Sequence, residues 1–323
     1  MASGNFPFTN SNNDDLLDAF QNVFHSRPNN CDDDFVKNTI TKINTNIHDF
    51  DIFTDENETI QTKVISPYIT EKQLASTFLN NGINTFSLLH VNIRSMNKNF
   101  ESLNNLLDQS NFNFSVLGLS ETWFSDKPNS LFSIPGFDLV YNNRINKTGG
   151  GVGMYISSAY RYSERPNLNY MNDSIETIFV EIESVERKNI IIGVVYRPPK
   201  SSQNEFLSQL QNILANPLLR NKDCILMGDF NINLLNYDND TFVQEFYGTL
   251  LTSSFMPLIY KPTRIMDKSS TLIDNIFTNI HPFPKAGVVI SDLTDHFPIF
   301  ASFQSNYRSQ KILSINEYFL TKI

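Results

Sequence analysis

From residue 81 onward, the apolar positions of this chain fall into short runs that are separated by polar turns. Two runs, Ile190 to Val195 and Cys224 to Met227, are apolar throughout, whereas others alternate apolar and polar residues. Runs of this length and composition predict β-strands. The predicted strands cover residues 85–93, 115–121, 137–143, 151–157, 175–183, 189–197, 223–230, 271–279 and 286–291.

Three longer segments between the strands have a helical spacing. Residues 99–110, 202–216 and 240–254 place apolar side chains at positions i, i+3 and i+4, which predicts amphipathic helices. Strands that are apolar throughout need cover on both faces, and alternating strands need it on one. The pattern therefore predicts an α/β fold of four layers (α/β/β/α), with two mixed sheets packed face to face and the helices outside.

The two ends of the chain lack this pattern. Residues 1–80 are rich in Asn and Asp, with scattered apolar residues at roughly helical spacing between Leu16 and Phe24. We expect a polar, acidic extension that is partly disordered or helical. The expected domain spans residues 81–305, and residues 306–323 are expected to form a linker or tail.

Composition and charge narrow the class of protein. A hydrophobic content of 40% in 323 residues is enough for a substantial core, so we expect a globular protein. The net charge of −9 argues against holding nucleic acid through bulk charge alone. Residues 1–80 carry 5 Lys and Arg against 12 Asp and Glu, which leaves 20 against 22 for residues 81–323. The larger part of the chain is thus nearly neutral.

The sequence also predicts where the protein is found. The N-terminus lacks the basic stretch and apolar core of a secretory signal, and the longest apolar run, Ile190–Tyr196, is too short to cross a bilayer. The two cysteines, Cys31 and Cys224, are far apart and fit no disulfide or metal framework. We therefore expect a protein of the cytosol or nucleus that is neither secreted nor inserted in a membrane.

Polar residues stand at or near the ends of many apolar runs. A single one usually marks only the point where a strand reaches water. Asp274 differs, because it interrupts an apolar run, and an unpaired carboxylate there is costly unless a cation or donor meets it. Carboxylates and amides beside one histidine suit a hard, oxygen-liganded metal and phosphodiester hydrolysis, whereas zinc would need more His or Cys. The set is Asn92, Glu121, Tyr196, Asp229, Asn231, Asp274, Asp295 and His296.

Seven segments of the chain resemble, in the same order, those of the endonuclease/exonuclease/phosphatase superfamily, which has the DNase I-like fold. They are "LLHVNIRSM", "LGLSETWF", "GGGVGMYI", "IIGVVYRPP", "ILMGDFNINL", "STLIDNIFTN" and "SDLTDHFPIF". The ordered set, over about residues 86–303, is far more specific than any one segment. "SETWF" and "VVYRPP" are most similar to the apurinic-type endonuclease domain of non-LTR (LINE-type) retrotransposons.

The resemblance implies a metal and a water at the site. Glu121 would be the principal ligand of Mg²⁺, or of Mn²⁺ in its place, with Asn92 and Asp295 beside the metal. Asp229 would orient or deprotonate the attacking water, and Asn231 would position that water and the scissile phosphate. Asp229 and Asn231, two apart, are expected to face the same way on an extended backbone. Gly228, directly before them, is expected to let the chain turn close to the site.

The resemblance also implies how the phosphate is held. His296 would bond a phosphate oxygen, Asp274 would fix the imidazole through its other ring nitrogen, and Tyr196 would donate to the phosphate. A carboxylate beside an imidazole favours its charged form, so we expect a raised pKa for His296. Thr294 stands where the family often has Ser, and the hydroxyl is kept.

Other features are interpreted structurally or as nucleic-acid contacts. The glycines of "TGGGVGMYI" do not lie between a strand and a helix as in a dinucleotide site, so we expect a tight strand entry. Trp123 is expected to pack beside Glu121. Basic residues in loops near the candidate strands are the predicted phosphate contacts. They are Arg94, Lys98, Arg144, Lys147, Arg197, Lys200, Lys261 and Arg264.

The expected function is that of a magnesium-dependent endonuclease that nicks DNA and leaves a 3′ hydroxyl, which would prime reverse transcription. Its expected partners are DNA and a reverse-transcriptase domain or RNA of the same element. Three alternatives remain. One is the same chemistry on another phosphate ester (abasic DNA, an RNA 3′ end, a phosphoinositide or a sphingolipid), since substrate does not follow from fold. The others are an inactive interaction module and a partner-recruiting role for residues 1–80.

Overall fold

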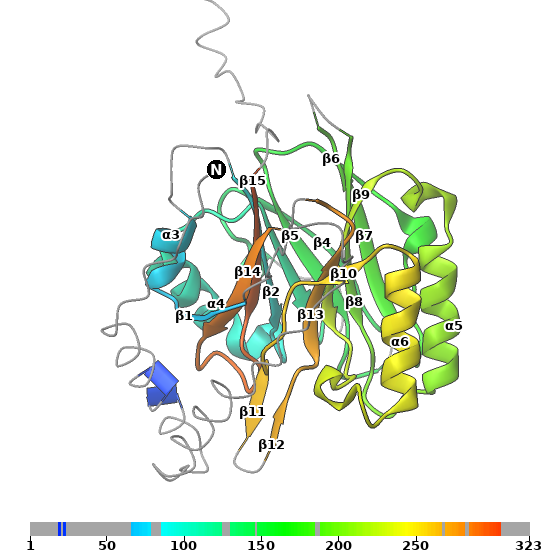
Figure 1. The fold of residues 1–323 in the computed structure, drawn as a ribbon. Coiled ribbons are helices and arrows are strands. Elements are labelled where there is room, and N and C mark those ends of the chain that lie inside the picture. Colours follow the sequence, from blue (N-terminus) through cyan, green and yellow to red (C-terminus); the bar gives the residue numbers. More distant parts are fainter. Residues whose placement is uncertain are drawn as a thin grey trace, which may run out of the picture.

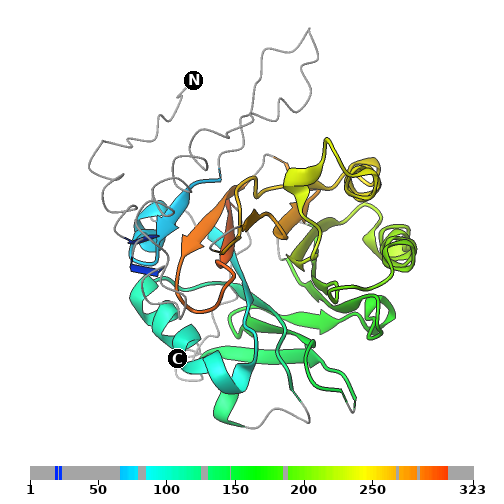
Figure 2. The same cartoon turned by 90° about the horizontal axis from the view of Figure 1, so that it is seen from below.

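Two mixed β-sheets packed face to face form the centre of the molecule. The computed structural model describes residues 19–20, 22–23, 66–78, 85–124, 130–145, 147–184, 188–266, 269–281 and 284–304. Helices α3 and α4 cover the outer face of one sheet, and α5 and α6 cover the outer face of the other (Figures 1 and 2). The predicted four-layer α/β/β/α architecture is confirmed. Its physical cause is that the apolar strands of both sheets need cover on two faces.

The first sheet has seven strands. In spatial order they are β1 (Tyr68–Thr70), β14 (Lys285–Ile290), β15 (Ile299–Gln304), β2 (Thr85–Asn92), β3 (Val116–Ser120), β5 (Val152–Ser157) and β4 (Phe137–Asn142). Strands β2 and β3 run parallel, as do β1 and β14, and the other neighbours are antiparallel.

The second sheet has six strands. In spatial order they are β10 (Met256–Pro257), β13 (Asp274–Thr278), β9 (Asp223–Asp229), β8 (Ile190–Tyr196), β7 (Glu176–Ile182) and β6 (Tyr162–Glu164). Only β8 and β9 run parallel within this sheet as it is described. A separate hairpin pairs β11 (Arg264–Met266) with β12 (Ser269–Thr271). Each sheet thus contains a central parallel pair whose carboxyl ends lie at one edge.

The helices begin where the sequence supplies a cap. The side chain of Ser202 accepts a hydrogen bond from the Glu205 N–H at the start of α5. Asp240 accepts from the N–H groups of Phe242 and Val243 at the start of α6. Such caps satisfy backbone donors that the first turn leaves unpaired. The helices span α3 (Gln73–Phe78), α4 (Met96–Ser110), α5 (Gln203–Leu214) and α6 (Thr241–Thr252).

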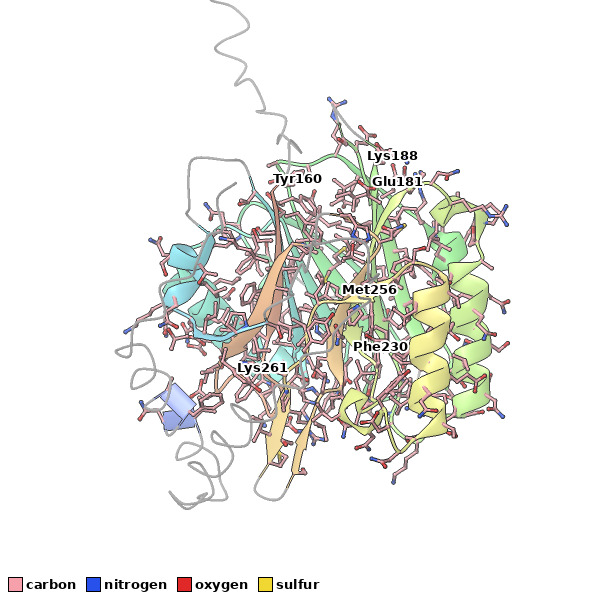
Figure 3. The ribbon with its side chains drawn as sticks, in the orientation of Figure 1. Tyr160, Glu181, Lys188, Phe230, Met256 and Lys261 are labelled. Atoms are coloured by element: carbon pink, nitrogen blue, oxygen red, sulfur yellow. The ribbon has the colours of Figure 1, made fainter. Side chains whose placement is uncertain are left out.

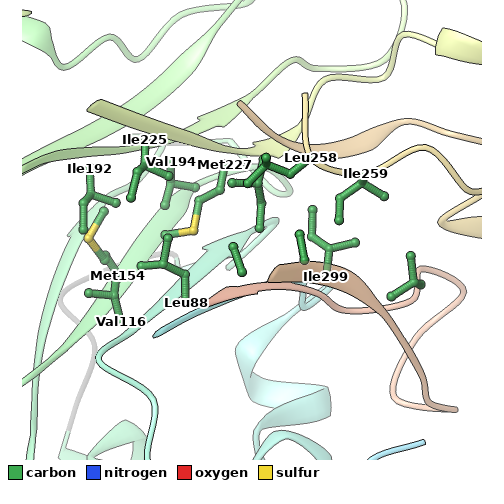
Figure 4. Close-up of a cluster of buried hydrophobic side chains, with 14 of the residues drawn as sticks. Leu88, Val116, Met154, Ile192, Val194, Ile225, Met227, Leu258, Ile259 and Ile299 are labelled. Atoms are coloured by element: carbon green, nitrogen blue, oxygen red, sulfur yellow. The ribbon is translucent and has the colours of Figure 1, made fainter. Parts of the chain in front are cut away.

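The core between the sheets is apolar and closely fitted. Figure 4 shows Leu88, Val116 and Met154 of the seven-stranded sheet facing Ile192, Val194, Ile225 and Met227 of the six-stranded one. A Cβ on Gly118 would lie only 2.6 Å from the Met227 Cε, so the glycine makes room for that side chain. Interiors packed this densely fix the separation of the sheets and therefore the distance between groups at their edges.

Gly228 has a different role from the expected one. It lies inside β9, opposite Val195 of β8, and not in a turn. A Cβ at this position would overlap the Val195 carbonyl oxygen, so only glycine allows the two backbones to approach this closely.

The structure departs from the predicted elements at several short strands. The strand expected at 271–279 is two strands, because β12 ends at Thr271 and β13 begins at Asp274. Asp274 is therefore at a strand start and not in mid-strand. Strands β1, β6, β10 and β11 have only two or three residues, too few to show a periodicity. β15 was also not predicted, although it is central in its sheet.

Part of the segment expected to be an extension belongs to the seven-stranded sheet. Strand β1 pairs with β14, and α3 follows it, so both precede the predicted boundary at residue 81. Upstream, Phe20 and Val23 are buried, and the Phe20 ring lies 5.1 Å from that of Tyr68 and 5.9 Å from that of Phe297. The rest of residues 1–65 and residues 305–323 lie outside the described residues. No helix in the described ranges is long and apolar enough to cross a membrane.

An ion-pair network around the buried Glu181 stabilises the C-terminal end of β7. Figure 3 shows Glu181 far from Phe230, the residue that follows β9. The carboxylate of Glu181 accepts hydrogen bonds from Arg165 Nε (2.8 Å) and Asn189 Nδ2 (2.8 Å) and pairs with Lys222. Burial alone would raise the pKa of Glu181, but these donors hold it at about 2.

Acid is expected to weaken this network. Because the folded-state pKa lies below the ordinary 4.5, the stabilisation is complete above that pH and is lost as pH falls toward 2. Glu181→Gln should lower the free energy of unfolding at pH 7, and its deficit relative to wild type should shrink between pH 4.5 and pH 2. Urea unfolding at several pH values measures this, with exposed Glu183→Gln as the control. A deficit that is constant with pH would contradict the assignment.

Candidate active site

Four polar side chains stand in one row across the six-stranded sheet. Glu176 is opposite Tyr196, Tyr196 is opposite Asp229, and Asp229 is opposite Asp274. Residues directly opposite each other on neighbouring strands share a face of the sheet. Tyr196 and Asp229 end the parallel strands β8 and β9, whereas Glu176 and Asp274 begin the antiparallel strands beside them. The strand ends thus gather three predicted residues and one, Glu176, that was not predicted.

The seven-stranded sheet brings two more predicted residues to the same edge. Asn92 is the last residue of β2, and Glu121 directly follows β3, the parallel neighbour of β2. Glu121 has a backbone φ of 56°, in the left-handed region that non-glycine residues seldom adopt. Strain of this kind is concentrated at functional sites, where it fixes the direction of a side chain.

Asn92 connects the two sheets. Its Nδ2 donates to Glu121 Oε1 and to Asp229 Oδ2, both at 2.9 Å. Its Oδ1 is buried and has no hydrogen-bond partner among the described residues. A buried amide oxygen without a donor is costly, which points to a group that the protein chain itself does not supply.

Asp229 and Asn231 are close together, but not through an extended backbone. Asn231 has φ 48°, so the chain turns between them. The Asn231 N–H donates to Asp229 Oδ1 (2.9 Å), and its Nδ2 donates to the Arg197 carbonyl (2.8 Å). Asparagine tolerates the left-handed region better than most residues, which suits it to this position. The prediction that Asp229 and Asn231 lie close together is confirmed, but the extended backbone that was expected to bring them together is replaced by a turn.

His296 and Asp274 form the predicted pair. His296 Nδ1 lies 2.9 Å from Asp274 Oδ2, which also accepts from Thr263 Oγ1 (2.7 Å). Burial alone would lower the pKa of His296, but the carboxylates of Asp274, Asp229 and Asp295 raise it to about 9. For Asp274 the signs are reversed. Burial alone would raise the pKa of Asp274, but the charged imidazole of His296 keeps that pKa below its ordinary value.

The carboxyl group of Asp229 has a raised pKa, which favours its uncharged form. It is buried, and burial together with the Asp274 carboxylate raises the pKa of Asp229 to about 7, although His296 acts in the opposite direction. A cationic imidazole and a carboxyl group with a raised pKa therefore face the same space. Environments that separate two pKa values in this way supply an acid and a base in one site.

Asp295 is not arranged as predicted. Its Oδ1 pairs with Arg94 and its Oδ2 with Arg264 (2.8 Å to Nε), so both carboxylate oxygens are occupied by guanidinium groups. The pKa of Asp295 falls to about 2, because His296 and the two arginines outweigh its burial. Asp295 therefore neutralises arginines in this structure and does not present a free oxygen to a metal.

The predicted basic contacts separate into buried and accessible groups. Arg197 is buried, donates to the carbonyls of Asn231 and Ser201, and lies over two aromatic rings, so it supports the Asp229 turn and is not a surface contact. Lys261 is half-buried over the Tyr68 ring, 5.1 Å from its centroid. Arg144 pairs with Glu176, and Lys147 pairs with the exposed Asp173. Lys98 and Lys200 are exposed.

Three further residues at the site were missed. Glu176 begins β7, as Asp274 begins β13, so an acid preceding an apolar run was the available signal. His90 is buried, with Nε2 3.2 Å from Ser120 Oγ, and burial lowers its pKa to about 4, so it is neutral. Thr263, which holds Asp274, had no signal. Trp123 is 37% exposed and its Nε1 donates to Glu121 Oε2 (3.1 Å).

Two groups of ligand atoms lie at this edge. Asp229, Asp274 and His296 bring one donor atom each within 4.8 Å of one another, but Asp274 and His296 are already bonded together. The other group consists of Glu121 and the buried Asn92 Oδ1, which has no hydrogen-bond partner among the described residues. Oxygen ligands of this kind suit a hard divalent cation.

Two packed mixed sheets that gather acids, amides and a His–Asp pair at one edge define a DNase I-like fold of hydrolytic nucleases and phosphatases. The model of the endonuclease/exonuclease/phosphatase family matches residues 89–296, and the chain belongs to this family. The match contains Asn92, Glu121, Asp229, Asp274 and His296.

Solved structures agree on the fold. The endonuclease domain of TRAS1, a telomere-specific non-LTR retrotransposon, has a TM-score of 0.57 at 15% identity, over 71% of this chain and all of that domain. The AP endonuclease LMAP from Leishmania major has a TM-score of 0.55 at 11% identity, over 73% of this chain and 96% of that one. A 3′ phosphatase, NExo from Neisseria, bound to a product DNA hairpin, has a TM-score of 0.52 at 16% identity, over 68% of this chain and all of that one. No curated protein matches.

The His296–Asp274 pair gives a direct prediction. Asp274→Asn removes the anion that favours the charged imidazole, so the His296 pKa should fall from about 9 toward or below the ordinary 6.5. Titration of the imidazole signals by NMR measures this, and His296→Gln assigns them. Exposed Asp292→Asn should leave the titration unchanged. A His296 pKa that does not move in Asp274→Asn would exclude the pairing.

Proposed function

We propose that this protein is a metal-dependent endonuclease that nicks DNA by hydrolysis and leaves a 3′ hydroxyl, of the type that primes reverse transcription in non-LTR retrotransposons. The observation that carries the hydrolytic part is the Asn92 amide, which joins Glu121 to Asp229 and has a buried oxygen without a hydrogen-bond partner among the described residues, while Asp274, opposite Asp229 in the sheet, pairs with His296. The choice of DNA rests on the sequence resemblance, and the similarity of fold to a retrotransposon endonuclease domain supports it.

The metal site consists of Glu121 and Asn92. Their oxygens are hard ligands, and the buried Oδ1 of Asn92 lacks a donor, so the pair fits Mg²⁺, with Mn²⁺ as a substitute. When bound, the cation would offset negative charge on a phosphoryl oxygen and on the leaving oxygen. Trp123 and the Asn92 amide group hold the Glu121 carboxylate from two sides.

Asp229 and Asn231 act on the water. Asp229 takes a proton from the attacking water, and its pKa of about 7 suits a general base near neutral pH. Arg197 and the left-handed turn hold Asn231 in place, and Asn231 positions the water and the phosphate. As the water oxygen bonds to phosphorus, the bond from phosphorus to the 3′ oxygen breaks, and the leaving oxygen takes a proton from solvent, so that the products are a 5′ phosphate and a 3′ hydroxyl.

His296 and Tyr196 stabilise the phosphate. His296 is a cation fixed by Asp274, so it donates to a phosphate oxygen as negative charge develops there. Burial and then the Glu121 and Asp229 carboxylates raise the pKa of Tyr196, so its hydroxyl stays protonated and donates. Donors that are already in position cost no rearrangement in the transition state.

In this setting the enzyme acts in the nucleus. A 3′ hydroxyl on nicked DNA is the primer that a reverse-transcriptase domain extends on the element's RNA, so that domain and that RNA are the proposed partners.

Removal of a site residue should abolish nicking without unfolding the protein. Glu121→Gln and His296→Ala should each lower the rate of conversion of supercoiled plasmid to the open circle by roughly 10² or more. Glu101→Gln, at an exposed position of α4 outside the site, is the control, and circular dichroism verifies the fold. Nicking by Glu121→Gln at the wild-type rate would disprove the site, and no nicking by wild type would favour an inactive module.

Metal dependence is a separate expectation. EDTA should stop nicking by wild type, and excess Mg²⁺ or Mn²⁺ should restore it. The nicked product should be extended by a DNA polymerase without prior phosphatase treatment, which verifies the 3′ hydroxyl. Plasmid, abasic duplex, poly(A) and phospholipid are compared under the same conditions, and preference for any of the last three would replace the proposed substrate.

A further inference from the structure

A second buried ion pair lies beside Tyr196. Glu176 is fully buried and stands opposite Tyr196 in the strand register. Nε and Nη2 of Arg144 point at Glu176 Oε1, and the Gly151 N–H donates to Glu176 Oε2. Both oxygens of the carboxylate are therefore used to hold the loop between β4 and β5.

The three consecutive glycines of this loop make the arrangement possible. Gly149, Gly150 and Gly151 all have left-handed φ values, from 68° to 85°. A Cβ on Gly150 would lie 2.5 Å from the Arg144 guanidinium carbon and 2.6 Å from Glu176 Oε1. Other residues are strained in this backbone region and would displace the ion pair. The glycine run is thus more than a tight strand entry, because the absence of side chains there leaves room for the Arg144 guanidinium.

The guanidinium is fixed but not sealed. The Arg144 side chain is 19% exposed, and among the described residues its Nη1 has no protein acceptor. Arg144 pairs with Glu176, which stands opposite Tyr196 in the strand register, so the guanidinium lies close to the row formed by Glu176, Tyr196, Asp229 and Asp274. Because one buried carboxylate holds two of its nitrogens, little side-chain entropy remains to be lost when the third binds a ligand.

We propose that Arg144 binds a DNA backbone phosphate next to the scissile one, and that Glu176 and the glycine run are the positioning elements that hold it there. This inference rests on the proposed function. Arginine bonds phosphate oxygens through a fixed planar array of N–H groups, and such contacts set the register of a nucleic acid on a protein.

The test uses a pair of substitutions that leaves the net charge unchanged. Arg144→Gln alone strands the Glu176 carboxylate in the interior, which destabilises the fold. The double variant Arg144→Gln/Glu176→Gln removes both charges and leaves two neutral amides. Arg161→Gln is the matched control, because Arg161 is exposed and lies at the other end of β7, beside the β6 segment that pairs with Ile182.

The readout is binding of fluorescein-labelled duplex DNA in EDTA, followed by anisotropy from 50 to 200 mM salt (roughly the range where phosphate contacts are most visible). The double variant should bind about tenfold more weakly, and the slope of log Kd against log salt should fall by about one. Arg161→Gln should bind as wild type does, although it alters the net charge.

Two results overturn the inference. One is a folded double variant, verified by its Tm, with wild-type affinity and salt slope, since the pair would then be purely structural. The other is an equal loss in Arg161→Gln, which would show that the effect is not specific to the position of Arg144. Wild type that binds DNA without nicking it counts against the proposed function and leaves this test valid, whereas wild type that does not bind DNA overturns both.

Discussion

The hydrogen bonds from the Asn92 amide to Glu121 and Asp229 are the contact on which the candidate site depends. Glu121 follows a strand of one sheet and Asp229 ends a strand of the other, so neither sheet alone contains the site. His296 and Asp274 repeat this connection a short distance away. The site therefore exists only while the two sheets keep their native separation.

The apolar core behind this edge maintains that separation. Met227 fills the space left by Gly118 of the opposite sheet, and Asp229 lies two residues further along the same strand. Buried charges at the edge are costly unless they are paired. Glu176 pairs with Arg144, Asp274 with His296, and Asp295 with two arginines, whereas Asp229 has no cationic partner in the described part of the chain and its pKa is raised instead. Among the described residues, the amide oxygen of Asn92, one oxygen of Asp274 and the hydroxyl of Thr122, next to Glu121, are buried without a hydrogen-bond partner.

The sequence predicted what strong local patterns encode. Long apolar runs identified the inner strands of both sheets except β15, and polar residues after them identified Asn92, Glu121 and Asp229. It did not predict β1 or β10, which are too short to show a period and owe their place to pairing with distant strands. The arginines on Asp295, the burial of Arg197 and the contact of Thr263 with Asp274 depend on tertiary distances of this kind, which no local pattern contains.

The register of the six-stranded sheet limits how this protein can vary. Glu176, Tyr196, Asp229 and Asp274 are aligned because four strands are paired without offset, and a shift of one residue in any strand would turn its polar side chain to the opposite face. Insertions and deletions within these strands would therefore disrupt the row, whereas surface loops outside the paired strands tolerate changes in length. Changes in such loops leave the alignment of the four polar side chains intact.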